Sequence, residues 1–137
     1  MDIKKQIQSL FLLVGVLTGC GAKGGLYEDV TAAEAIKILE IPGTFLLDVR
    51  TPGEYQSGHL ANATLIPVQE LEQRLADLPA DKERPVLVYC RSGNRSVPAA
   101  KILGRQGYKN IINLKGGILE WARQDLPVET PPPRNPG

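Results

Sequence analysis

Residues 86–100 read VLVYCRSGNRSVPAA, an apolar run that ends at a cysteine and continues through a short loop into a helical pattern. A cysteine that only fills the core would be expected inside the apolar run, whereas Cys90 stands at its end. Sites in α/β proteins form beyond the carboxyl ends of the parallel strands. The position of Cys90 therefore predicts a functional residue at the edge of a sheet.

Strand-like and helix-like patterns alternate around this stretch. Four apolar runs predict strands, at 44–49, 63–67, 85–89 and 110–114, and helical spacing occurs at 31–40, 68–78, 96–103 and 118–122. The first helix opens with a capping box formed by Thr31 and Glu34, and Ser96 is the expected N-cap of the third. The alternation predicts an α/β fold with a mainly parallel central sheet flanked by helices on both faces.

The first 19 residues differ in character from the rest. Lys4 and Lys5 precede an apolar run at residues 10–17, LFLLVGVL, and small residues follow. This layout is typical of a secretory signal peptide. The run is too short to span a bilayer as a helix, which takes about 20 apolar residues. A buried first helix is the alternative, but the segment has no polar face, so we expect export.

The end of this segment, Leu17-Thr18-Gly19-Cys20, resembles the lipobox of bacterial lipoproteins. The resemblance implies cleavage before Cys20 and attachment of lipid to its sulfur. It also implies a membrane-anchored protein that faces the periplasm or the cell exterior. The alternative is an ordinary signal peptide in which Cys20 is incidental.

The remaining chain reads as one domain with two extensions. Residues 20–25 are rich in glycine and predict a flexible tether, and residues 26–126 carry the alternating patterns. Residues 127–137, PVETPPPRNPG, predict an extended or disordered proline-rich tail. The net charge is +1 and no basic stripe with interleaved aromatics occurs, so we expect no nucleic-acid partner. No cluster has the spacing of metal ligands, so no metal is expected.

The surroundings of Cys90 favour a reactive sulfur. If Cys20 carries lipid, Cys90 has no partner for an intrachain disulfide, because the chain has two cysteines. The thiolate is the nucleophilic form, and Arg91, Arg95 and the N-terminus of the following helix supply positive charge. Gly93 allows the backbone to curl so that N–H groups converge on an anion. The alternative is a buried structural cysteine, which would be inert.

The motif CRSGNRS, at residues 90–96, resembles the active-site loop of the rhodanese family of single-domain sulfurtransferases. Three more segments agree with that family: residues 46–67, LLDVRTPGEYQSGHLANATLIP, residues 107–121, GYKNIINLKGGILEW, and the opening helix at YEDVTAAEA, residues 27–35. The resemblance covers residues 26–126 in the family's order. It implies the rhodanese-like α/β fold.

The resemblance also implies the chemistry. Cys90 would take a sulfane sulfur from a small anionic donor such as thiosulfate and pass it, as a persulfide, to cyanide or to a thiol, including a protein thiol. No cofactor is implied. Arg91 would receive the donor, and Arg95 would either bind the donor or hold the loop in shape. The residues implied in donor binding are Arg91, Ser92, Gly93, Asn94, Arg95 and Ser96.

Other chemistries remain as alternatives. Related phosphatases and arsenate reductases have five residues between the cysteine and the arginine of this loop, whereas four separate Cys90 from Arg95, which suits a single sulfur atom better. A module that relays persulfide without turnover of its own is a second alternative. A redox sensor whose exposed thiol is oxidised to sulfenic acid is a third.

Two residues outside the loop are implied in its support, and a third, His59, is a candidate base. Asp48 and Arg50 follow a strand on the same edge, and by resemblance they help to frame the pocket. Arg50 is expected to pair with Glu54, and a purely structural ion pair is an equal alternative to a catalytic one. His59 is a candidate general base for Cys90 in a cysteine–histidine dyad. Because the loop itself can activate the sulfur, we expect His59 to have a packing or hydrogen-bonding role instead.

The closing block contains two adjacent glycines, Gly116 and Gly117. We expect a tight turn there that lets the chain pass close to the cysteine loop. Trp121, which follows them, is expected in the core.

Overall fold

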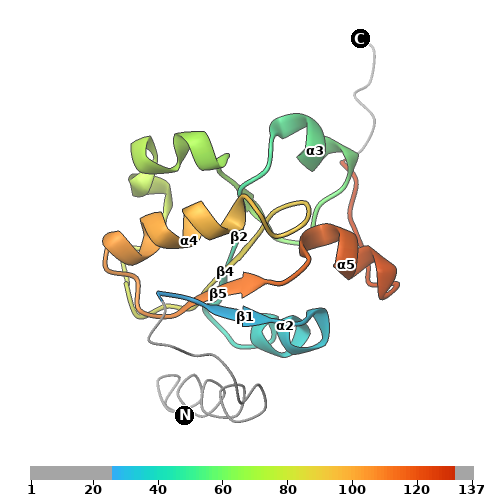
Figure 1. Ribbon diagram of the computed structural model, residues 1–137, viewed down its shortest axis with the longest axis horizontal. Coiled ribbons are helices and arrows are strands. Elements are labelled where there is room, and N and C mark those ends of the chain that lie inside the picture. The colour runs from blue at the N-terminus through green and yellow to red at the C-terminus, as the bar shows by residue number, and fades with distance from the viewer. Residues whose placement is uncertain (1–25, 132–137) are drawn as a thin grey trace.

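The computed structural model describes residues 26–131 (Figure 1). The predictions for residues 1–25, which include the signal peptide, the tether and lipidation of Cys20, lie outside the described residues. Within residues 26–131, no helix combines the length and the apolar character that a membrane span requires.

The described chain forms one five-stranded sheet in which every pair of neighbouring strands is parallel. The strand order is β1-β5-β4-β2-β3. The strands are β1 (Glu28–Val30), β2 (Phe45–Asp48), β3 (Thr64–Leu65), β4 (Val86–Tyr89) and β5 (Ile111–Leu114). The prediction of an α/β fold with a parallel sheet is confirmed.

Helices cover both faces of the sheet (Figure 1). The helices α2 (Ala32–Leu39) and α5 (Gly117–Arg123) pack on one face, and α4 (Ser96–Arg105) packs with the 3₁₀ helix η1 (Val68–Gln73) on the other. Along β4, the side chains alternate between the two apolar layers, and all four residues are buried. This explains why β4 is a continuous apolar run, as is usual for a strand buried on both faces.

Two elements were not predicted, and one was predicted with the wrong geometry. The edge strand β1 has three residues, two of them acidic, and the helix α3 (Pro52–Ser57) buries none of its residues, so neither shows an apolar pattern. Residues 68–78 form η1 and a second 3₁₀ helix, η2 (Leu75–Asp77), instead of one α-helix. Arg74, with a φ of −119° and a ψ of 32°, leaves the helical conformation and separates them.

The segment after α5 packs against the domain where the sequence predicted the start of a disordered tail. The indole N–H of Trp121 donates to the carbonyl oxygen of Pro127 at 3.0 Å. Glu129 and His59 exchange two backbone hydrogen bonds, both of 2.8 Å. Ordered contacts therefore extend beyond the predicted boundary at residue 126. The rest of the predicted tail, residues 132–137, lies outside the described residues.

Candidate active site

The sulfur of Cys90 lies at the carboxyl edge of the sheet, directly after β4. The backbone N–H of Gly93 donates to it at 3.0 Å. This contact requires a sharp turn of the loop, and Gly93 has a φ of 103°, in the left-handed region that favours glycine. The turn at Gly93 is as expected, but among residues 26–131 the Gly93 N–H is the one backbone donor on the sulfur, where several converging N–H groups were expected.

The hydroxyl group of Ser96 closes the turn from the other side. It donates to the carbonyl oxygen of Gly93 at 3.0 Å and lies 3.7 Å from the Cys90 sulfur. Ser96 is the first residue of α4, and Arg95 occupies the N-cap position without a side-chain cap. The prediction of Ser96 as the N-cap is wrong by one residue, because its hydroxyl bonds within the loop. The positive end of the α4 dipole faces the loop.

Cys90 is buried more deeply than the sequence predicted, with 1% of its surface exposed. The sulfur contacts the N–H of Gly93 and the hydroxyl of Ser96, whereas Arg91, Ser92 and Asn94 of the same loop are exposed. The redox-sensor alternative needs an exposed thiol, so this burial argues against it. The burial is what the alternative of a structural cysteine expects, but that alternative does not account for the Gly93 N–H on the sulfur.

The start of α5 is hydrogen-bonded to the backbone of the cysteine loop. The N–H groups of Ile118 and Leu119 donate to the carbonyl oxygens of Cys90 and Arg91, at 3.0 and 3.1 Å. Gly117 has a φ of 61°, and a Cβ atom there would overlap the backbone of Cys90 and Arg91. The predicted close passage of the two glycines beside the cysteine loop is confirmed.

The two loop arginines have different surroundings. The guanidinium group of Arg95 forms two hydrogen bonds with the carboxylate of Glu54, at 2.6 and 2.7 Å. The paired guanidinium lowers the pKa of Glu54 to about 2, and the same hydrogen bonds raise the pKa of Arg95. Within residues 26–131, the Arg91 side chain is exposed and makes no hydrogen bond or ion pair. Arg91 is therefore free to meet an anion.

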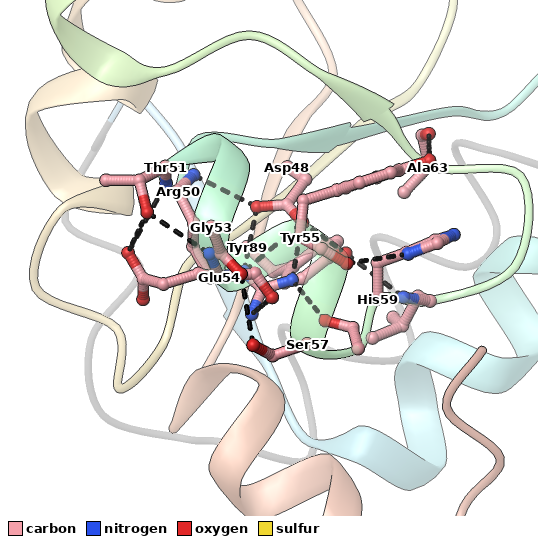
Figure 2. Close-up of polar contacts among 12 residues, drawn as sticks. Asp48, Arg50, Thr51, Gly53, Glu54, Tyr55, Ser57, His59, Ala63 and Tyr89 are labelled. Atoms are coloured by element: carbon pink, nitrogen blue, oxygen red, sulfur yellow. Dashed lines mark hydrogen bonds and ion pairs between the residues drawn. The ribbon is translucent and has the colours of Figure 1, made fainter. Parts of the chain in front are cut away.

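Asp48 and Arg50 form a buried ion pair on the neighbouring strand end (Figure 2). Arg50 donates to both oxygens of Asp48, and the hydroxyl of Tyr89 donates to the same carboxylate at 2.7 Å. Burial alone would lower the pKa of Arg50, but the bonds to Asp48 outweigh it and raise the pKa. Burial, with the nearby Asp48, raises the pKa of Tyr89. The network fixes the residue that precedes Cys90.

The predicted pairing of Arg50 with the Glu54 carboxylate is wrong. That carboxylate binds Arg95, and Arg50 reaches only the backbone carbonyl oxygen of Glu54, at 3.4 Å. The reason is local: Asp48 lies two residues from Arg50 and accepts from its Nε and Nη2, while Nη2 also donates to the carbonyl oxygen of Gly58. Sequence reasoning missed Glu54 as a partner of the loop, although its capping box with Thr51 is a readable helix start.

The imidazole ring of His59 packs against Tyr55 and makes no contact with Cys90 within the described residues. Its ring stacks on Tyr55, with centroids 3.7 Å apart, and its Nδ1 lies 3.0 Å from the Tyr55 carbonyl oxygen. His59 is 7% exposed. These contacts agree with the expected packing and hydrogen-bonding role.

Comparisons with known proteins agree with this geometry. Residues 31–124 match the family model described as a rhodanese-like domain. A protein named sulfurtransferase from Allochromatium vinosum is 39% identical over 95 residues, which cover 69% of this chain and 87% of that protein. A tRNA uridine(34) hydroxylase from Erwinia tasmaniensis is 35% identical over 105 residues, which cover 71% of this chain but 30% of the hydroxylase.

Solved structures show the same fold. A rhodanese-related protein from Thermoplasma volcanium has a TM-score of 0.69 and 32% identity, covering 77% of this chain and 100% of that one. A rhodanese-like domain protein from Staphylococcus aureus has a TM-score of 0.67 and 28% identity, covering 77% of this chain and 99% of that one.

Proposed function

The chain belongs to the rhodanese-like family, and we propose that it is a sulfurtransferase that carries a sulfane sulfur on Cys90. The observation that supports this most strongly is the cysteine at the carboxyl end of β4, with a backbone N–H on its sulfur and a helix N-terminus facing its loop. An N–H donor and a helix N-terminus stabilise negative charge that develops on a bound sulfur during transfer.

The proposed reaction has two steps. The Cys90 thiolate attacks the outer sulfur of thiosulfate, an S–S bond forms, and the donor's own S–S bond breaks so that sulfite leaves with the electron pair. A nucleophile, cyanide or a thiolate, then attacks the outer sulfur of the persulfide, and the Cys90 thiolate is the leaving group. This is covalent catalysis, for which ping-pong kinetics are expected.

The loop residues have distinct proposed roles in these steps. The N–H of Gly93 stabilises negative charge on the sulfur, as donors in an oxyanion hole do for oxygen. Arg91 receives the anionic donor at the exposed surface of the loop. Ser96 fixes the turn through Gly93. Asp48 and Arg50 support the end of the neighbouring strand.

Turnover of thiosulfate by the purified protein tests this function. Assays with cyanide alone, and with an added small or protein thiol, separate two cases. A free-standing enzyme turns over with cyanide, whereas a relay module turns over only when its thiol partner is present. Cys90→Ser is expected to abolish both activities. Activity that survives Cys90→Ser would contradict the proposal, and so would a complete lack of transfer to every acceptor.

We also propose that the protein is exported and anchored to a membrane through lipid on Cys20, facing the periplasm or the cell exterior. The motif Leu17-Thr18-Gly19-Cys20, placed after a short apolar run, supports this. An anchored enzyme would meet donors and acceptors at the membrane surface.

A further inference from the structure

Glu54 binds two partners that lie far apart in the sequence. Its two carboxylate oxygens accept from the Arg95 guanidinium at 2.6 and 2.7 Å, although 41 residues separate them. One of these oxygens also accepts from the backbone N–H and the hydroxyl of Thr51, at 3.3 and 3.1 Å. Glu54 thus connects the cysteine loop, residues 91–95, to the start of α3.

The helix that carries Glu54 is itself fixed to the sheet. Arg50, buried on Asp48, donates to the carbonyl oxygen of Gly58 at 2.7 Å, and Gly58 is the C-cap of α3. His59, the next residue, pairs with Glu129 through two backbone hydrogen bonds. Figure 2 shows Arg50 between Asp48 and the helix. Because α3 is held in this way, Glu54 is a fixed support for Arg95.

The Arg95–Glu54 pair differs from an ordinary surface ion pair. Its side chains are 33% and 27% exposed, and it has the two parallel bonds of a bidentate contact. The pair of Arg105 and Glu72 has one contact of 3.3 Å and side chains that are 63% and 65% exposed. Exposed pairs of this second kind contribute little to stability. The Arg105–Glu72 pair is therefore a matched control.

We propose that Glu54 is a positioning residue for the cysteine loop: its carboxylate holds Arg95 and keeps the loop closed over Cys90, so Arg91 is the loop arginine that meets the donor. The role of Glu54 in loop closure follows from the geometry, whereas the role of Arg91 toward the donor rests on the proposed sulfur transfer.

Loop closure is tested by alkylation of Cys90 with iodoacetamide in the full chain, followed on the peptide that contains Cys90. Because Cys90 is 1% exposed, the rate follows the population of the open loop. Glu54→Gln keeps an oxygen for the α3 capping box but removes the charge. We expect Glu54→Gln and Arg95→Gln each to raise the rate about fivefold, as weakening a partly buried pair by about 1 kcal/mol would do.

Three further variants make this test specific. Glu72→Gln is expected to leave the alkylation rate unchanged, because Glu72 pairs with Arg105, which is outside the cysteine loop, and both side chains are exposed. The double variant of Glu54→Gln with Arg95→Gln is expected to match either single variant. Arg95→Lys keeps the charge but lacks the planar fork, so we expect it to raise the rate as well. Rates equal to that of the native chain in both Glu54→Gln and Arg95→Gln would overturn the proposal.

The kinetics of thiosulfate turnover test whether Arg91 or Arg95 binds the donor. We expect Arg91→Gln to raise KM for thiosulfate about tenfold, the effect of losing about 1.4 kcal/mol of binding. Arg95→Gln is expected to lower kcat and to change KM by less than about twofold, a split that separates positioning from binding. A KM increase in Arg95→Gln equal to that in Arg91→Gln, with an unchanged alkylation rate, would show that Arg95 binds the donor and would overturn the proposal.

Failure of the proposed sulfur transfer and failure of the proposed loop closure give different results. If the native chain transfers no sulfur, the proposed function fails, and the alkylation rates still decide whether Glu54 closes the loop.

Discussion

The backbone of Gly117 lies so close to the carbonyl oxygen of Cys90 that a Cβ atom at position 117 would overlap it. The next residue, Ile118, donates its N–H to the same oxygen at 3.0 Å. The start of α5 is thereby joined to the residue that carries the reactive sulfur. The glycine permits the contact, and the hydrogen bond maintains it.

Gly117→Ala tests this contact. The new methyl group would meet backbone atoms, which cannot move aside as a flexible side chain can, and the φ of 61° is unfavourable for alanine. We expect a loss of more than about 1 kcal/mol in the free energy of unfolding, and a lower kcat because the loop shifts. Denaturant unfolding and thiosulfate turnover measure the two effects.

Gly53→Ala is the matched control for that substitution. A Cβ atom at Gly53 meets nothing within 4 Å, and Gly53 lies in α3 without a positive φ. Alanine is the better helix former, so we expect the free energy of unfolding to rise by less than about 1 kcal/mol. Equal effects of the two substitutions would contradict the assigned close contact at Gly117.

Tyr89→Phe tests the network beneath the site. The hydroxyl of Tyr89 donates to Asp48 and accepts from the backbone N–H of Leu60 at 3.1 Å, and all three residues are buried. Its removal leaves the Leu60 N–H without an acceptor. We expect a loss of about 1–3 kcal/mol in the free energy of unfolding, measured by denaturant titration.

Tyr27→Phe serves as the comparison for Tyr89→Phe. Tyr27 is only partly buried, and within residues 26–131 its hydroxyl makes no hydrogen bond. A change within about 0.5 kcal/mol is expected. If both tyrosine substitutions have the same small effect, the network does not stabilise the fold.

The pH dependence of stability tests the charge on Glu54. Its pKa is lowered from 4.5 to about 2, mainly by the hydrogen bonds from Arg95. A lowered pKa in the folded state means that the contribution of Glu54 to stability is present above pH 4.5 and is lost as the pH falls towards 2. The difference in unfolding free energy between the native chain and Glu54→Gln should therefore shrink over that interval. A difference that is constant across it would contradict the assignment.

Cys20→Ser tests the proposed anchor. Cells that express the full chain are expected to place it in the membrane fraction, with a lipid-modified Cys20 as the first residue of the mature protein. Cys20→Ser should remove the lipid and release the protein from that fraction, because no other lipid attachment is proposed. Mass spectrometry of the mature N-terminal peptide measures the modification. An unmodified Cys20 in the native chain would contradict the proposal.

Local sequence patterns were sufficient to predict the centre of the fold. The runs that became β2, β4 and β5 are apolar because these strands are buried, and each therefore has a readable signal. The roles of Gly93 and Gly117 were predicted for a related reason. A backbone that turns sharply or passes close to another needs glycine, and this need is visible in the sequence.

The parts that sequence reasoning missed depend on contacts between distant segments. Nothing near Arg95 indicates that its partner is Glu54, which lies 41 residues earlier on a helix without an apolar stripe. The burial of Cys90 was also missed, because it depends on the contacts of its sulfur with Gly93 and Ser96 and on the hydrogen bonds that the start of α5 makes to the loop. Similarly, Glu129 pairs with His59 although the surrounding composition predicts disorder.

The central claim is that Cys90 carries the transferred sulfur, and mass spectrometry after treatment with thiosulfate tests it most directly. The account predicts that the peptide containing Cys90 gains the mass of one sulfur atom, and that cyanide then removes this sulfur. A Cys90 peptide that stays unmodified after thiosulfate treatment, in a folded protein whose thiol is free, would contradict it.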